Sequence, residues 1–341
     1  MFAHAHQVVQ EAIAARQIPG AVWLVARGGR VLAREAQGYA DPERSIPMTV
    51  ETVFDLASLT KVTATLPAVL VLLERGQFRL DDPLVQFLPE FPAPQVRLRH
   101  LLTHTAGFPS GERLWGRGWT RAEALAHVAR LAPAHPVGQK VLYSDISFQL
   151  LGLAVERLTG RRLDEAAREL VFEPLGMRGA TFAPGPDTAP TEYREALGRH
   201  QQGEVHDENA TALEGVAGHA GLFGTVDDLL AYAAMWMGWP GPRVLSPATR
   251  ATASRALVES EGERRGLGWL LRGAQYASCG DLMSLEAFGH TGFTGTSMWM
   301  DPLQDLAVIL LTNRVYYGRQ EHILRIRPRF HNAAVAAASR L

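Results

Sequence analysis

Lysine and cysteine are both scarce in this chain of 341 residues. Lysine occurs only as Lys61 and Lys140, so 32 of the 34 Lys and Arg residues are arginine. Cys279 is the one cysteine, which excludes an intrachain disulfide and permits a reducing compartment. A lysine kept among so many arginines suggests a position where the side chain has to release its proton, because arginine stays protonated in proteins.

Excess charge and long apolar runs are missing as well. The net charge is −1 with both signs mixed along the chain, so we expect neither nucleic acid nor a membrane surface as partner. No apolar run reaches the length of a membrane span. The N-terminus lacks a basic region followed by an apolar core, which predicts no signal peptide and a cytoplasmic location. A chain trimmed of its leader would show the same pattern, and the oligomeric state stays open.

What the sequence does contain is an arrangement of segments that predicts an α+β fold. Strand-like patterns occur near both ends of the chain, over residues 21–40 (a hairpin around Gly28-Gly29), 267–273, 297–302 and 306–314. From Ser58 to about Thr225 the signals are mostly helical, and a last helix is expected over residues 331–341. We therefore predict one antiparallel sheet flanked by helices, with a mostly helical domain inserted between its strands.

This prediction divides the chain into two domains. Residues 1–55 and 225–341 would form the sheet domain, and residues 56–224 the helical one. Capping-box patterns at Thr120–Glu123 and Thr225–Asp228 mark the start of two helices within this scheme. The active site would lie between the two domains.

The first lysine stands one helical turn after a serine. In "DLASLTK", Ser58 is expected at the first turn of a helix and Lys61 follows at i+3 on the same face. A serine hydroxyl is a poor nucleophile unless a neighbour takes its proton, and neutral lysine does so when burial or nearby cations lower its pKa. A helix-capping serine with an unrelated surface lysine is the alternative interpretation, because S-x-x-K alone is a weak motif.

Two further motifs follow Ser58 and Lys61 in a meaningful order. They are Tyr143-Ser144-Asp145 in "VLYSDISFQLLG" and His290-Thr291-Gly292 in "FGHTGFTGTSMWM". With S-x-x-K, this set resembles the penicillin-recognising serine enzymes. The tyrosine is similar to that of class C β-lactamases, D-alanyl-D-alanine carboxypeptidases and family VIII carboxylesterases. "RHLLTHTAGF", "FEPLGM" and "GHAGLFGTVDDLLAY" extend the resemblance from about Ile18 to Asn313.

The resemblance implies a β-lactamase/transpeptidase-like fold and a role for each motif residue. Ser58 would be the nucleophile that becomes acylated, and Lys61 and Tyr143 would share proton transfer, with either as the formal base. The backbone N–H groups of Ser58 and Phe293 would form the oxyanion hole. Substrate contacts would come from Asp145, His219, His290, Thr291 and Gly292. The chemistry implied needs no cofactor.

Two residues depart from the family pattern. Asp145 replaces an asparagine, exchanging an amide for a carboxylate that either holds Lys61 protonated or positions it by a charge-assisted bond. His290 replaces the lysine of K-T-G, and a histidine is expected to titrate near neutral pH. Both changes favour esters or a nonstandard amide over penicillins, whose carboxylate the lysine would hold.

A second use of the histidines has to be weighed. His206, Asp207 and His219 are suitable zinc ligands in type, and a metal-dependent amidase is therefore an alternative. Against it, the sequence lacks H-E-x-x-H and any compact ligand spacing, so we predict no metal. His100 and His104 are expected to have structural roles.

The predicted function is hydrolysis of short-chain carboxylic esters through an acyl-enzyme on Ser58, with weak β-lactam turnover. The substrate would be a small ester, amide or β-lactam. One alternative is a D-Ala peptidase or muropeptide amidase, because "VHDENATALEGVAGHAGLF" and "RPRFHNA" resemble penicillin-binding-protein-like hydrolases linked to cell-wall recycling. The other is a non-catalytic penicillin sensor that stays acylated.

Overall fold

The computed structural model describes residues 2–273 and 277–341. Its main feature is a nine-stranded antiparallel sheet in the order β3-β2-β1-β13-β12-β11-β10-β9-β8. The strands are β1 (Gly20–Arg27), β2 (Arg30–Asp41), β3 (Ile46–Pro47), β8 (Val258–Ser260), β9 (Glu263–Arg265), β10 (Leu270–Leu271), β11 (Phe288–Thr291), β12 (Ser297–Asp301) and β13 (Leu306–Thr312). The two ends of the chain meet where β1 pairs with β13, from Ala21 opposite Thr312 to Arg27 opposite Leu306. The predicted α+β fold with a sheet built from both ends is confirmed.

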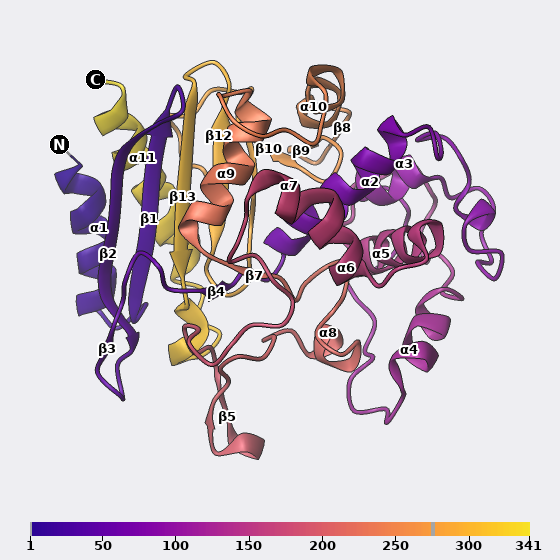
Figure 1. Cartoon of the computed structure of the whole chain (residues 1–341), viewed down its shortest axis with the longest axis horizontal. Coiled ribbons are helices and arrows are strands. Elements are labelled where there is room, and N and C mark those ends of the chain that lie inside the picture. Colours follow the sequence, from indigo (N-terminus) through magenta and orange to yellow (C-terminus); the bar gives the residue numbers. More distant parts are fainter. Residues whose placement is uncertain (1, 274–276) are drawn as a thin grey trace.

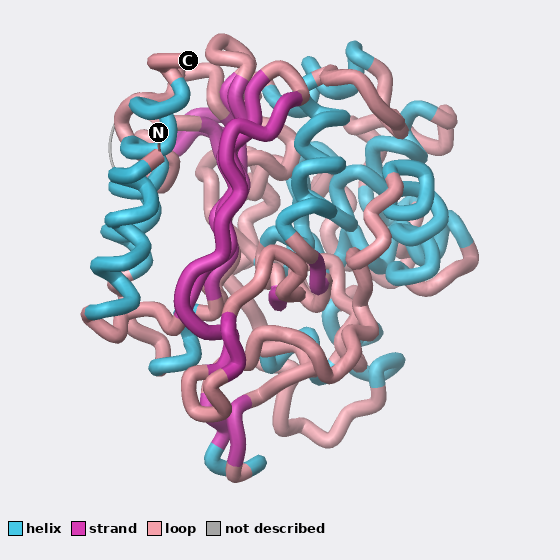
Figure 2. The backbone as a smooth tube through the Cα atoms, turned by 60° about the vertical axis from the view of Figure 1, so that its left-hand side comes forward, coloured by secondary structure: helices cyan, strands magenta, loops and turns pink. Residues whose placement is uncertain are grey.

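Helices cover both faces of this sheet (Figures 1 and 2). On one face, α1 (Ala3–Ala14) and α11 (Ile323–Ala338) pack together around Trp23 and Phe330. On the other face lies α9 (Val226–Met237), whose apolar residues join the core beneath the helical region. The central strands are buried on both sides, which explains the unbroken apolar run of β13.

The mostly helical segment predicted between the strands is present. It contains α2 (Leu66–Glu74), α3 (Leu98–Leu102), α4 (Arg121–Val128), α5 (Asp145–Thr159), α6 (Leu163–Ala167), α7 (Glu173–Leu175) and α8 (Glu208–Ala212). Short paired strands, β4 (Phe54–Asp55) with β7 (Phe223–Gly224) and β5 (Tyr193–Arg194) with β6 (Arg199–His200), interrupt it, and α10 (Pro247–Ser254) follows α9. One continuous apolar core includes sheet residues such as Leu24 and helical residues such as Leu150. The division into two domains stays a prediction.

Local structure departs from the sequence prediction in two places. The strand expected over residues 267–273 is reduced to β10, and Gly268, with a left-handed φ of +73°, keeps the extended conformation from beginning at residue 267. The last helix begins at Ile323 and accommodates Pro328 in its interior, so it is longer than predicted. No helix among the described residues is long and apolar enough to cross a membrane.

Candidate active site

Ser58 follows a strained turn that a buried carboxylate stabilises. Ala57 has φ +48°, an unfavourable conformation for a residue with a side chain. Asp55 lies at the end of β4, and its carboxylate accepts hydrogen bonds from the N–H of Ala57 at 2.8 Å and the N–H of His206 at 2.7 Å. Burial raises the pKa of Asp55 despite these bonds. The sequence analysis did not identify Asp55, which sets the direction in which the chain enters the helix.

The helix after Ser58 begins with an irregular turn. Residues Lys61–Thr65 form a π-helical turn, which is continued by α2. Such turns are rare and occur frequently at functional sites. Lys61 is completely buried, and its Nζ donates to Ser58 Oγ at 3.1 Å and to the His219 carbonyl oxygen at 3.0 Å. Ser58 and Lys61 are thus in contact, as their spacing predicted.

Asp145 completes the surroundings of the ammonium group. Its Oδ1 lies 2.7 Å from Lys61 Nζ. Burial disfavours the charged lysine, but Asp145 and Tyr143 outweigh this effect and raise the pKa of Lys61 above its usual value. The lowered pKa that the sequence interpretation required is therefore not found. The sequence left two effects open for an aspartate at this position. Asp145 has both, because its ion pair positions Lys61 and favours the protonated form of that lysine.

Tyr143 lies between two cations. Lys61 Nζ is 5.0 Å from the centroid of its ring, and the guanidinium carbon of Arg265 is 5.4 Å from the same point. His104 supports the segment from behind, because its Nδ1 accepts a hydrogen bond from the Ser144 N–H at 3.1 Å and its ring lies 4.8 Å from that of Tyr143. A structural role for His104 agrees with this position.

His290 is part of β11 and is buried. Burial lowers its pKa well below 6.5, and the positive charges of Arg265 and Lys61 lower it further. Its Nδ1 donates to the Thr291 carbonyl oxygen at 2.8 Å, since a carbonyl only accepts. The expectation that His290 titrates near neutrality is wrong: this position holds a neutral imidazole.

The turn after β11 brings Phe293 close to the nucleophile segment. Thr294 Oγ1 donates to the Asp55 carbonyl at 2.7 Å, and Thr296 Oγ1 donates to the Leu56 carbonyl at 3.1 Å. A Cβ on Gly292 would collide with Thr296 Oγ1 and the Leu56 carbonyl oxygen, so only glycine permits this approach. The two backbone segments proposed as the oxyanion hole are therefore fastened to one another.

His219, Asp207 and His206 do not form a common cluster. His219 is buried, and its Nε2 lies 3.0 Å from Asp207 Oδ1. His206 instead faces Glu192, with 3.2 Å between Nε2 and Oε2. Ligand atoms of Asp145, Asp207 and His219 do lie within 4.8 Å of one another, but the Lys61 ammonium is paired with Asp145 there. The zinc set considered from the sequence is thus not brought together.

A cavity of about 490 Å³ opens over residues of all three motifs. It is lined by Ser58, Tyr143, His290, Thr291, Gly292 and Phe293, together with several arginines, among them Arg265. Asp145 and His219 are not part of this lining; both contact Lys61, Asp145 through its carboxylate and His219 through its carbonyl oxygen. Arg265 was missed because it lies on β9, far in sequence from every motif.

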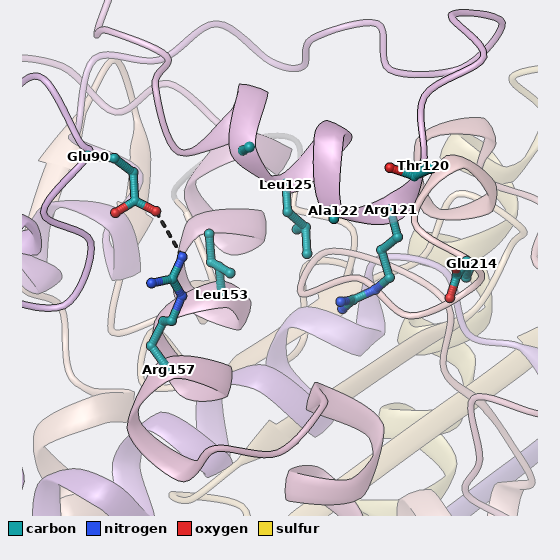
Figure 3. A pocket seen from close by; sticks show the side chains of 9 residues that line it. Glu90, Thr120, Arg121, Ala122, Leu125, Leu153, Arg157 and Glu214 are labelled. Carbon is teal, nitrogen blue, oxygen red and sulfur yellow. Dashed lines mark hydrogen bonds and ion pairs between the residues drawn. The ribbon is translucent and has the colours of Figure 1, made fainter.

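A second hollow lies between α4 and α5 (Figure 3). Its charged side chains are paired, Arg157 with Glu90 at 3.0 Å and Arg121 with Glu156 at 2.6 Å. It contains none of the motif residues, and its balanced charges give no reason to connect it with catalysis.

Comparison with known proteins settles the family. A family model described as beta-lactamase matches residues 5–330. The chain belongs to the β-lactamase family. Among curated members, it is similar to an N-acetylmuramyl-L-alanine amidase of Bacillus subtilis (30% identity, covering 90% of this chain and 80% of the relative) and a putative D-alanyl-D-alanine carboxypeptidase of Escherichia coli (28%, covering 87% and 78%).

Solved structures of the family agree with the fold. EstCE1, described as a hydrolase with promiscuous acyltransferase activity, superposes with a TM-score of 0.79 at 26% identity, covering 98% of both chains. A class C β-lactamase from Rhodobacter sphaeroides superposes with a TM-score of 0.78 at 20% identity, covering 98% of this chain and 99% of the other. The β-lactamase/transpeptidase-like fold expected from the motifs is therefore confirmed, and the chain is a member of a serine hydrolase family.

Proposed function

We propose that this β-lactamase-family member hydrolyses short-chain carboxylic esters through an acyl-enzyme on Ser58, and turns β-lactams over slowly. The observation that carries the proposal is the contact of the buried Lys61 Nζ with both Asp145 and the Oγ of Ser58, which lines the cavity. A buried ammonium aimed at a serine oxygen stabilises that oxygen as it becomes anionic. The resemblance to EstCE1 supports an ester substrate.

The proposed reaction assigns the attack to Ser58, the proton transfers to Tyr143 and the stabilisation of the oxyanion to two backbone N–H groups. Ser58 Oγ attacks the ester carbonyl carbon, and the electrons of the C=O bond move to the oxygen, which the N–H groups of Ser58 and Phe293 stabilise. Since an ammonium cannot accept a proton, the Ser58 proton passes to Tyr143 in its phenolate form, and the Lys61 ammonium near the Tyr143 ring stabilises that anion beforehand. When the tetrahedral intermediate collapses, the alcohol leaves and takes the proton from Tyr143. Water then attacks the acyl-enzyme, again giving its proton to Tyr143, and the acid is released as Ser58 regains a proton.

The neutral His290 supports esters over amides. An alkoxide departs with little protonation, whereas an amide nitrogen has to be protonated as the intermediate breaks down. The third motif supplies no cation for this step or for a penicillin carboxylate, because His290 is neutral. Of the four arginines that line the cavity, Arg265 and Arg319 are ion-paired with glutamates, and Arg314 and Arg327 bind backbone carbonyls.

A muropeptide amide is the second candidate substrate. The similarity to an N-acetylmuramyl-L-alanine amidase favours it, since that relative is 30% identical over most of its length. The same nucleophilic serine would cleave an ester or a muropeptide amide. The ester and amide proposals therefore differ only in which substrate fits into the cavity.

One panel distinguishes these possibilities. Short p-nitrophenyl esters, nitrocefin, D-Ala-D-Ala peptides and muropeptides are assayed side by side, with and without EDTA. We expect the esters to be the best substrates and the chelator to have no effect. Faster turnover of muropeptides would support the amidase, chelator-sensitive activity would support a metal enzyme, and acylation without turnover would indicate a sensor.

A further inference from the structure

Arg327 is a buried arginine beside the sheet edge that carries the third motif, and it contributes to the lining of the cavity. It lies on α11 and is 5% exposed. Within residues 2–273 and 277–341, no carboxylate lies at ion-pair distance from its guanidinium. A buried cation without a counter-ion is costly, so its retention calls for a physical reason.

The partners of Arg327 are two backbone carbonyls of one tight turn. Its Nη2 donates to the Gly292 oxygen at 2.6 Å and to the Thr296 oxygen at 2.9 Å. The turn is closed by Gly292 N–H donating to the Thr296 oxygen at 2.8 Å. The guanidinium therefore joins both ends of the turn between β11 and β12.

One of these carbonyls belongs to the peptide unit that supplies an oxyanion-hole donor. The Gly292 C=O and the Phe293 N–H are the two poles of a single planar, trans peptide, so they point in opposite directions. Fixing the oxygen on one side fixes the direction of the N–H on the other. A charge-assisted bond to the oxygen also polarises the unit and strengthens its N–H as a donor.

A second arginine binds the next peptide unit, between Phe293 and Thr294, in the same way. Arg314 Nε donates to the Phe293 oxygen at 2.8 Å, and its guanidinium carbon lies 4.6 Å from the Phe293 ring centroid. Two arginines thus bind carbonyl groups of the turn, while Thr294 and Thr296 bind it to the segment before Ser58.

We propose that Arg327 is a positioning residue, which orients and polarises the Gly292–Phe293 peptide so that its N–H stabilises the oxyanion formed when Ser58 attacks. Arg327 also contributes to the lining of the cavity, but in this step it acts on the peptide through the Gly292 carbonyl oxygen. As negative charge develops on the substrate oxygen, the cation on the far side of the peptide reinforces the hydrogen bond. The inference rests on the proposed function, because it needs acyl-enzyme chemistry at Ser58.

The test compares Arg327→Met and Arg327→Lys with Arg329→Met. Arg329 is a matched control, since it lies on the same helix but is paired with Glu11 at the surface, at 2.8 Å. Removing one oxyanion-hole donor outright costs about 10² to 10³ in kcat. Because the donor stays but loses its support, we expect Arg327→Met to lower kcat for p-nitrophenyl butyrate by roughly ten- to a hundredfold, with little change in KM. Arg327→Lys should restore part of the loss, and Arg329→Met should match the wild type.

A transition-state analogue separates positioning from a general loss of structure. A boronic acid forms a tetrahedral adduct with the catalytic serine, and its affinity should fall by the same factor as kcat/KM across the Arg327 variants. Thermal unfolding identifies any variant that does not fold, in which case Arg327→Lys carries the test. Folded Arg327 variants with wild-type kcat and wild-type boronate affinity overturn this inference alone. Failure of the wild type to be acylated at Ser58 overturns the proposed function and the inference together.

Discussion

The two walls of the cavity stabilise charge in different ways. On the helical wall, the Lys61 ammonium is buried and has a carboxylate partner in Asp145 and a hydroxyl partner in Ser58. On the sheet wall, the third motif presents a neutral His290, and the neighbouring Arg327 is bound to backbone carbonyls. The helical wall brings a charge directly to Ser58 Oγ, whereas the arginines of the sheet wall are bound to glutamates or backbone carbonyls.

This difference indicates where the chemistry depends on a side chain. A lysine aimed at the nucleophile cannot be replaced without losing a charge at that atom. A neutral imidazole in the third motif contributes shape and a hydrogen bond but no fixed charge. Substitutions on the helical wall should therefore affect every substrate, whereas substitutions at His290 should change the preference between substrates.

Loss of the nucleophile is expected to have the largest effect. Ser58→Ala should reduce ester turnover by at least about 10⁴-fold, because the covalent route is removed. A fluorophosphonate should add one phosphonyl group to the wild type, and mass spectrometry should locate it on the peptide containing Ser58. Ser110→Ala, an exposed serine, serves as the control. Labelling that persists in Ser58→Ala would contradict the assignment.

Removal of the buried cation should come next. Lys61→Met keeps the length of the side chain but removes its charge, and kcat/KM for p-nitrophenyl acetate should fall by about 10³. Lys61→Arg should also lose most activity, since a guanidinium is larger than the enclosed site around Nζ. Lys140→Met is the matched control, because the only other lysine is paired with Glu261 at the surface. Near wild-type activity in Lys61→Met would contradict a role of the Lys61 charge in the reaction.

Asp145→Asn should change the pH profile more than the rate at neutral pH. Asp145 contributes most, together with Tyr143, to raising the pKa of Lys61 against burial, so its removal should let that pKa fall. If Lys61 acts as a cation, the alkaline decline of kcat/KM moves to lower pH, with a loss of about tenfold on that limb. Profiles of wild type and variant between pH 6 and 10 measure this. An activity that instead rises at lower pH than in the wild type would identify neutral Lys61 as the base.

The smallest effect is expected at the sheet wall. Because the pKa of His290 lies well below 6.5, the ratio of ester to nitrocefin turnover should stay constant between pH 7.5 and 6. His290→Lys should raise nitrocefin turnover relative to ester turnover by up to about fivefold, the value of an ion pair worth about 1 kcal/mol. A ratio that changes with pH in the wild type but not in His290→Lys would show that His290 does titrate.

Short-range patterns made much of this arrangement predictable. Ser58 and Lys61 are one helical turn apart, and their contact follows from that spacing together with the helix that the sequence predicts. The alternating and apolar runs near both ends of the chain predicted the strands that pair as β1 and β13. Gly292 was part of a motif, although the collision that requires glycine there involves Leu56, which is distant in sequence.

The sequence by itself determined the α+β fold and the residue types of three motifs, because helical spacing, strand patterns and short motifs are local properties of the chain. Only the tertiary structure decided the charges. Lys61 stays protonated because folding brings Asp145 to it, and His290 stays neutral because folding buries it beside Arg265. Arg327 and Asp55 become important in the same way, since each acts on a backbone group that only the folded chain places next to it. Protonation depends on burial and on neighbours distant in sequence, and these exist only once the chain is folded.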